Sequence, residues 1–148
     1  RLQIGRALTN ILKNAAESIN GRPEADDSTL EPGRIQLILC IDGRRPHIEI
    51  SDNGKGFPGD LFDRITEPYV TTRERGTGLG LAIAKKIAED HSGELLLRNN
   101  IDGGASVTIV LGEITPAEAT LMGVKNALLE TASPECAEQN VEAAPHEE

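Results

Sequence analysis

The spacing of apolar residues predicts two amphipathic helices. The first spans residues 2–19, and its apolar positions are Leu2, Ile4, Leu8, Ile11, Leu12, Ala15 and Ile19. This interval of three to four residues is that of one helix face. Gly21 and Pro23 end the pattern. A second helix is predicted over residues 79–90, where a glycine-rich stretch precedes it and Gly93 follows it.

Between and after these helices, alternating or aliphatic runs predict four strands. They cover residues 34–41, 47–51, 94–99 and 106–111, with turns at Asp42-Gly43 and at residues 100–104. Residues 20–33 form a polar loop, and the irregular stretch 58–75 contains a short helix near 60–65. Two helices beside two strand pairs indicate an α/β fold, a two-layer sandwich whose mixed, largely antiparallel sheet carries its helices on one face.

The chain of 148 residues has the length of one domain, and 38% hydrophobic residues suffice for a core. Residues 113–148 hold eight Glu and one Lys, so they carry most of the net charge of −9. We therefore divide the chain into a domain at 1–112 and an acidic tail at 113–148. A weak helix is expected at 117–130, and disorder in the rest of the tail.

Composition also excludes several classes of protein. The first 112 residues hold 16 acidic and 14 basic groups, which gives no electrostatic case for a nucleic-acid surface. There is no apolar run of membrane-spanning length and no signal peptide. Cys40 and Cys136 do not make a disulfide framework and are expected to be reduced thiols in a cytoplasmic setting. The chain opens on Arg1 inside a helical pattern, so we expect it to be a piece of a longer protein.

Three segments carry residues suited to chemistry, and the first is the polar stripe of the first helix. Asn10, Asn14 and Glu17 lie at positions i, i+4 and i+7 and share one face, with Lys13 beside them. Asn disfavours helix interiors, so two of them one turn apart suggest a function. An amide oxygen suits Mg²⁺ shared with phosphates. The alternative is a solvated helix face.

The second segment is Asp52-Asn53-Gly54-Lys55-Gly56, which follows a strand directly. A carboxylate at a strand end only accepts hydrogen bonds, so it selects the exocyclic amine of adenine over the carbonyl of guanine. Gly54 and Gly56 permit close approach by a flat ligand. The alternative is an ordinary turn capped by Asp.

The third segment is Gly76-Thr77-Gly78-Leu79-Gly80 at the start of the second helix. Glycines before a helix N-terminus expose N–H groups that favour an anion. The segment is neither a Walker A loop nor a good dinucleotide fingerprint. Arg73 and Arg75 lie just upstream and could reach phosphates or be solvated loop residues.

In combination and in order, the segments NILKNA, DNGKGF, EPYVTT and GTGLGL resemble a known family over residues 1–112. The chain resembles the ATP-binding catalytic domain of sensor histidine kinases, in the superfamily that also holds gyrase, Hsp90 and MutL. The four segments match the N, G1, F and G2 boxes of that family. The amino-acid sequences of the two helices are most similar to those of nitrogen-regulation kinases of the NtrY/NtrB type. The family's first strand before the N box is missing, as expected for a truncated start.

The resemblance implies a Mg-ATP site. It makes Asn10 and Asn14 the catalytic residues, with Asn14 as the Mg²⁺ ligand. The nucleotide would be bound by Lys13, Asn14, Asp52, Gly54, Gly56, Tyr69, Thr72, Arg73, Gly76, Thr77, Gly78, Leu79 and Gly80. A mobile lid would be anchored by Phe57, Phe62, Pro68 and Tyr69. Two departures from the family are Tyr69 in place of Phe, and Ser92 in place of a glycine.

The resemblance also implies a reaction and partners. The family's ATPases carry a Glu one turn before the metal-binding Asn, and Asn10 stands there instead. An amide cannot take a proton from water, so we expect transfer of the γ-phosphoryl group to a histidine rather than hydrolysis. His47, His91 and His146 lack the family's acceptor context. The acceptor would lie on an upstream dimerisation domain of a membrane-anchored parent, which passes the phosphoryl group on to a response regulator. The fragment itself would be cytoplasmic and monomeric, without nucleic-acid or membrane contact.

Three alternatives stay open at this point. The chain could be an ATPase of the gyrase–MutL type, against which Asn10 argues. It could be a degenerate nucleotide-binding or partner-binding module, against which the intact Asn14, Asp52 and glycines argue. It could be a serine kinase of the anti-sigma-factor group, whose members also tend to carry the Glu that is replaced here.

Overall fold

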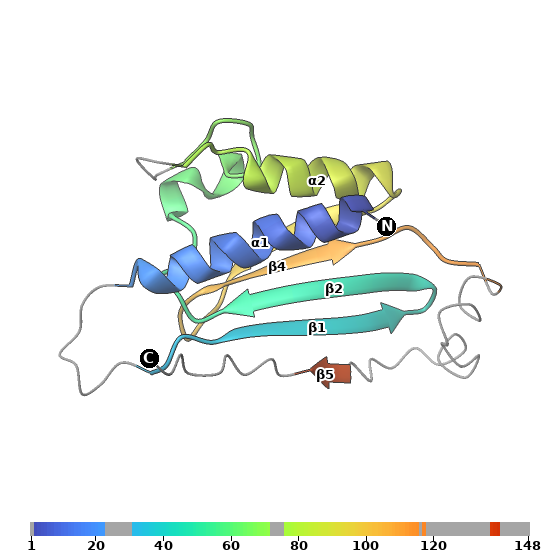
Figure 1. Ribbon diagram of the computed structural model, residues 1–148, viewed down its shortest axis with the longest axis horizontal. Helices are drawn as coiled ribbons and strands as arrows, with labels where there is room; N and C mark the ends of the chain where they lie inside the picture. Colours follow the sequence, from blue (N-terminus) through green and yellow to red (C-terminus); the bar gives the residue numbers. More distant parts are fainter. Residues whose placement is uncertain (1, 23–30, 72–75, 116, 118–136, 140–148) are drawn as a thin grey trace.

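The computed structural model describes residues 2–22, 31–71, 76–115, 117 and 137–139. Two helices, α1 (Leu2–Asn20) and α2 (Gly80–Asp90), lie side by side over one face of a sheet (Figure 1). The strands are β1 (Ile35–Asp42), β2 (Arg45–Asp52), β3 (Glu94–Asn99), β4 (Ala105–Val110) and a short β5 (Ala137–Gln139). A 3₁₀ helix, η1 (Gly59–Arg64), lies between β2 and α2. The predicted α/β two-layer sandwich is confirmed.

The strand order in the sheet is β3-β4-β2-β1-β5. Each pair of neighbouring strands in the described part of the chain is antiparallel, so the sheet is antiparallel there rather than mixed. In the β1–β2 pair Ile35 lies opposite Asp52, and in the β2–β4 pair Ser51 lies opposite Ser106. This register brings the end of β2 next to the start of β4, where the candidate site is found.

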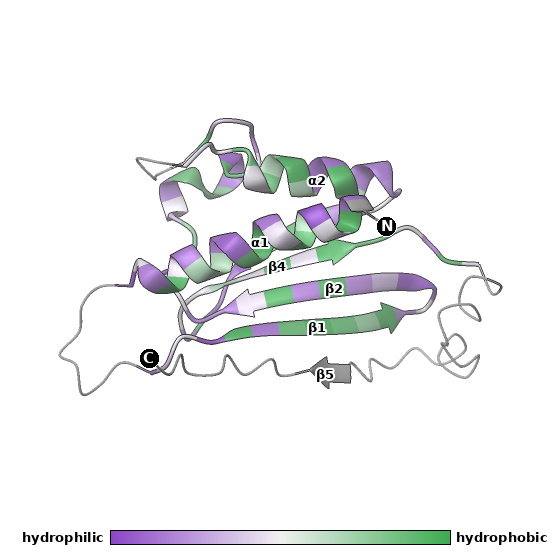
Figure 2. Ribbon diagram, viewed as in Figure 1, coloured by the Kyte–Doolittle hydropathy of each residue, from purple (hydrophilic) through white to green (hydrophobic). Residues whose placement is uncertain are grey.

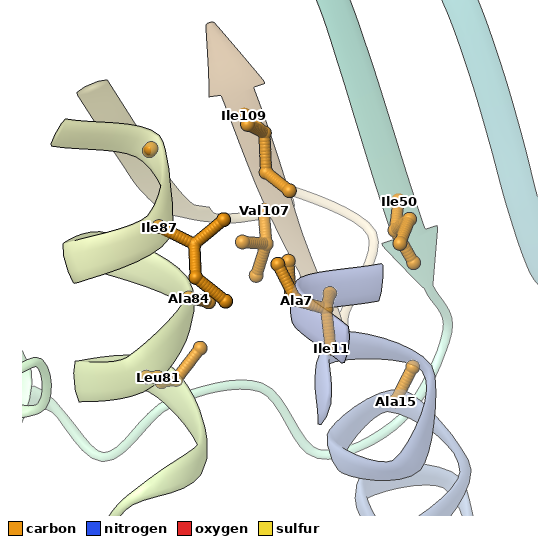
Figure 3. Packing of buried hydrophobic residues seen from close by; sticks show 10 residues of the cluster. Ala7, Ile11, Ala15, Ile50, Leu81, Ala84, Ile87, Val107 and Ile109 are labelled. Carbon is orange, nitrogen blue, oxygen red and sulfur yellow. The ribbon is translucent and has the colours of Figure 1, made fainter. Parts of the chain in front are cut away.

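The core lies between the helices and the sheet (Figure 3). Helix α1 contributes Ala7, Ile11 and Ala15, and the sheet contributes Ile50, Val107 and Ile109, all at most 5% exposed. From α2 come Leu81, Ala84, Ile87 and Ala88. Alanine at several of these positions lets the helix backbones approach the sheet and each other closely. Hydrophilic and hydrophobic residues alternate along α1 (Figure 2).

The end of α2 explains how the chain accommodates Ser92 where the family commonly has a glycine. Ser92 adopts φ 55°, the left-handed conformation that follows many helices. The Gly93 N–H then donates to the Ala88 carbonyl at 2.9 Å. A Cβ on Gly93 would lie 1.9 Å from the Val110 carbonyl oxygen, so the glycine is needed at this second position. The turn is kept although one glycine is replaced.

The tail differs in part from the expectation. Ala137–Gln139 forms β5 and pairs with Leu37–Leu39 of β1, so the predicted disorder is wrong at these three residues. The weak helix expected at 117–130 falls almost wholly on residues 118–136, which lie outside the described residues, as do 140–148. Within the part of the chain that is described, no helix is long and apolar enough to cross a membrane.

Candidate functional site

A cavity of about 310 Å³ opens between the two helices and the loop that follows β2. Its volume is at the lower end of the range for small-molecule sites. Of the residues predicted to bind or act on a ligand, ten line it: Asn10, Lys13, Asn14, Asp52, Gly56, Gly76, Thr77, Gly78, Leu79 and Gly80. These residues come from three separate segments of sequence, which the fold brings to one place.

One end of the cavity is built around Asp52, the last residue of β2. Asp52 is 9% exposed, and its carboxylate accepts the Gly54 N–H at 2.8 Å. Burial raises the pKa of Asp52, while hydrogen bonds from Gly54, Ser18 and Ala105 act in the opposite direction and lower it. A buried carboxylate held by several donors is fixed in position and presents an acceptor to a ligand.

The walls beside Asp52 are apolar. Ile50 of β2 and Ala105 and Val107 of β4 line the cavity next to the carboxylate, and the Phe57 ring joins them from the loop. The Phe57 and Phe62 rings meet edge to face, with centroids 6.1 Å apart. A slot with apolar walls and one hydrogen-bond acceptor is suited to a flat heterocycle that carries an amine.

The other end of the cavity is amide-rich. Asn10 and Asn14 project from α1 toward the start of α2, where Gly80 leaves room for them. A Cβ on Gly80 would lie 3.6 Å from Asn14 Nδ2 and 3.8 Å from the Asn10 Cβ. The Asn10 Nδ2 atom is buried and has no hydrogen-bond partner among the described residues. Such an orphaned donor is rare in folded proteins, and a bound ligand is one of its ordinary explanations.

Helix α2 begins at this same end. Its N-cap residue, Leu79, makes no side-chain hydrogen bond that caps the helix. Gly78 adopts φ 63°, and a Cβ on it would lie 2.6 Å from the Tyr69 carbonyl carbon, so glycine is required. Uncapped N–H groups at a helix start favour an anion. Lys13 and Lys55 also line the cavity and add positive charge.

The structure does not place every predicted residue in the cavity wall. Gly54, expected to line the nucleotide pocket, packs against α1 instead: a Cβ on it would lie 2.3 Å from Ser18 Oγ and 2.6 Å from the Ile19 nitrogen. Tyr69, expected to anchor a lid, is 78% exposed and adopts φ 67°, although its N–H donates to the Gly78 carbonyl at 3.0 Å. Thr72 and Arg73 lie outside the described residues.

Several residues that support the site were not predicted. Ser18 hydrogen bonds to Asp52 and, through its Oγ, accepts the Gly56 N–H at 3.3 Å. Asn99 accepts the Phe57 N–H in the loop after β2, and Asn100 donates to the carbonyl of Asp52, the last residue of β2. The helical spacing of Ser18, one turn after Asn14, was a usable signal. The two asparagines gave no local signal, since they are more than forty residues from their partners.

Comparison with known proteins agrees with this geometry. Residues 1–114 match the model of the family described as histidine kinase-, DNA gyrase B- and HSP90-like ATPases. The chain is 46% identical over 107 residues to a sensor histidine kinase NtrY-like protein of Rickettsia typhi, covering 72% of this chain and 16% of that protein. It is 46% identical over 112 residues to the nitrogen regulation protein NtrY of Azorhizobium caulinodans, covering 75% and 14%. The chain thus spans about a sixth or less of the length of these curated relatives.

Solved structures give the same result. The catalytic domain of histidine kinase ThkA superposes with a TM-score of 0.62 at 29% identity, over 76% of this chain and 69% of that one. Full-length ShkA, solved in complex with AMPPNP, superposes with a TM-score of 0.60 at 26% identity, over 76% of this chain and 22% of that one. The chain therefore belongs to the histidine kinase-, DNA gyrase B- and HSP90-like ATPase family, as a catalytic ATP-binding domain of the sensor histidine kinase type.

Proposed function

We propose that this domain binds Mg-ATP in the cavity and transfers its γ-phosphoryl group to a histidine on another domain of its parent protein. Adenine would lie in the apolar slot with its exocyclic amine donating to Asp52. The triphosphate would run toward Asn10, Asn14 and the start of α2. The assignment of these roles to these residues is part of the proposal.

The observation that carries the proposal is the chemical difference between the two ends of one cavity. The Asp52 end offers an acceptor and apolar walls, while the opposite end offers the amides of Asn10 and Asn14 and the N-terminus of α2. A ligand that fits both ends has a heterocyclic amine at one end and an anion at the other. Adenine nucleotides have this distribution of groups.

The residues at the amide end also fit Mg²⁺. Within the described residues there is no cluster of three or more His, Cys, Asp or Glu side chains. A cation held here would therefore take its ligands from the phosphates, from water and from Asn14, as is usual for Mg²⁺ at nucleotides. When bound, Mg²⁺ neutralises charge on the phosphates. Asn10 would donate its unpartnered N–H to a phosphate oxygen, and Gly80 would keep the space beside Asn14 open.

The position of the carboxylates favours transfer over hydrolysis. Among the described residues, the acidic ones that line the cavity are Asp52, at the adenine end, and Glu17, within 4.0 Å of the Lys13 ammonium. Asn10 stands where a water-activating Glu would be needed, and an amide cannot act as a base at neutral pH. Catalysis would then consist of positioning and charge neutralisation. We expect slow hydrolysis by the isolated domain.

The proposal extends to the setting of the reaction. The acceptor histidine would lie on a dimerisation domain of the same protein, and a response regulator would receive the phosphoryl group from it. The domain would work on the cytoplasmic side of a membrane-anchored parent. The names of the relatives and their much greater length support this arrangement.

The test is a labelling experiment. The domain is incubated with γ-labelled ATP, Mg²⁺ and the dimerisation domain of its parent, and acid-labile label on that partner is measured. We expect label on the partner with the wild-type domain and none with Asn14→Ala. Steady release of inorganic phosphate without labelled partner would favour an ATPase instead.

A further inference from the structure

We propose that Asn99, at the end of β3, is a positioning residue that sets the adenine side of the cavity by holding the loop after β2. Together with Asn100 and Gly104 of the β3–β4 turn, it forms what we term the hairpin bracket. The inference rests on the proposed nucleotide site, because it concerns how one wall of that site is kept in place.

The Asn99 side chain makes two hydrogen bonds to a single residue of the loop, Phe57. Its Oδ1 accepts the Phe57 N–H at 2.8 Å, and its Nδ2 donates to the Phe57 carbonyl at 2.9 Å. One amide thus satisfies both backbone polar groups of a residue whose ring lines the cavity. The two bonds fix the Phe57 backbone relative to the sheet.

Gly56, the neighbour of Phe57, lies close to the same side chain. Its φ is 74°, and a Cβ on it would lie 2.9 Å from Asn99 Oδ1 and 3.0 Å from the Gly104 carbonyl oxygen. The loop therefore lies flat against the bracket on this side. On the other side the Gly56 N–H donates to Ser18 Oγ of α1. The cavity wall is clamped between the helix and the β3–β4 turn.

The bracket also reaches the backbone of Asp52. Asn100 Nδ2 donates to the Asp52 carbonyl at 3.2 Å and to Ser51 Oγ at 3.1 Å, and Asn100 Oδ1 accepts the Ser106 hydroxyl at 2.8 Å. Ser106 is 1% exposed, so this network is anchored in the sheet. A Cβ on Gly104 would lie 1.9 Å from the Asp52 carbonyl oxygen, which shows how closely the turn packs against the Asp52 backbone.

Asn99 is suited to a test because it is exposed. Its replacement leaves no buried polar group unpaired, since water can reach the Phe57 backbone. An Asn99 variant should therefore still fold, but the loop after β2 loses the hydrogen bonds that order it in the free protein. The cost of ordering then falls on binding.

The experiment is calorimetric titration of ATP and of GTP, both with Mg²⁺, into the wild-type chain and Asn99→Ala. We expect ATP affinity to fall about fivefold, the size expected for two exposed hydrogen bonds. A guanine base, whose carbonyl the Asp52 carboxylate repels, would not occupy the slot beside Phe57. We therefore expect GTP affinity to change less than twofold, so that the preference for ATP narrows. Asn99→Asp keeps the acceptor for the Phe57 N–H and loses the donor. Its ATP affinity should lie between that of the wild-type chain and that of Asn99→Ala.

Ile109→Val is the matched control for lost stability, because it removes a methylene group from the core without changing a residue that lines the cavity. It should bind ATP as the wild-type chain does. Parallel losses for ATP and GTP in Asn99→Ala would mean a general structural role and would overturn the inference, as would unchanged ATP affinity. Failure of the wild-type chain to bind ATP would instead overturn the proposed function itself.

Discussion

The two ends of the cavity differ in how far their polar groups are already hydrogen-bonded within the protein. At the adenine end, the Asp52 carboxylate accepts bonds from Gly54, Ser18 and Ala105, and the Phe57 backbone is held by Asn99. At the phosphate end, Asn10 Nδ2 is buried without a partner in the described chain, and the N-cap residue of α2, Leu79, makes no side-chain capping bond. The first end is rigid before the ligand binds, while the second has polar groups that a ligand would satisfy.

This difference suggests a division of labour. A preorganised acceptor provides selectivity, because a base other than adenine meets a carboxylate whose orientation is fixed by its hydrogen bonds. Unsatisfied donors provide affinity for charge, because their cost in the free protein is recovered when phosphate binds. The predictions below test this division, beginning with the largest expected effect.

Asn14→Ala should abolish the Mg²⁺-dependent part of ATP binding. Loss of even an outer-shell partner of a metal ligand costs about 10–100-fold, and for a direct ligand we expect a loss of about 100-fold. Titration of ADP without metal should show little change, since the adenine end is untouched. If Mg²⁺ still strengthened ATP binding to the variant, Asn14 would not be the metal residue.

Asp52→Asn should weaken ATP binding by more than tenfold, because a mispaired buried contact costs about 1–3 kcal/mol. The amide can also donate, so the preference for ATP over GTP should shrink. Competition between the two nucleotides measures this directly. Unchanged affinity and preference would remove Asp52 from the site.

Two glycine variants separate folding from binding. Gly54→Ala places a methyl group 2.5 Å from the Ser18 carbonyl carbon, and this overpacking should cost about 1–3 kcal/mol of unfolding free energy. Gly80→Ala meets Asn14 Nδ2 at an ordinary 3.6 Å and should fold as well as the wild-type chain. It should nevertheless weaken Mg-ATP binding a few-fold, because its methyl group would occupy the space beside Asn14. Chemical denaturation and calorimetry report the two effects, and equal stability of both variants would contradict the account.

The smallest expected effect is on stability against pH. Burial raises the pKa of Asp52 in the folded chain, so the folded state binds more protons than the unfolded state between the ordinary Asp pKa and the raised one. The contribution of this group to stability is therefore full below that window and falls as pH rises through it. Asp52→Asn removes the cost of burying an ionised carboxylate. At pH 7 the melting temperature of the variant should therefore equal that of the wild-type chain or lie a few degrees above it. The advantage should disappear below the ordinary Asp pKa, and a clear loss at pH 7 would contradict the assignment.

The sequence allowed the helices, the strands and the ligand-facing motifs to be predicted because their signals are local. Asn10 and Asn14 share a helix face, Asp52 ends a strand, and the glycines precede a helix. The role of Asn99 depends on a partner 42 residues away, which only the register of the sheet brings close. Gly54 was predicted to face the ligand because glycine permits close approach, but the close approach is to α1. Spacing alone does not say which neighbour a glycine serves.

The central claim is that one cavity takes adenine at Asp52 and a magnesium-bound triphosphate at Asn14. The measurement that tests it most directly is calorimetric titration of ATP into this chain, with and without Mg²⁺, against GTP. We predict binding in the micromolar range that prefers ATP and is strengthened by Mg²⁺. Equal binding of ATP and GTP, or no binding of either with Mg²⁺ present, would contradict the account.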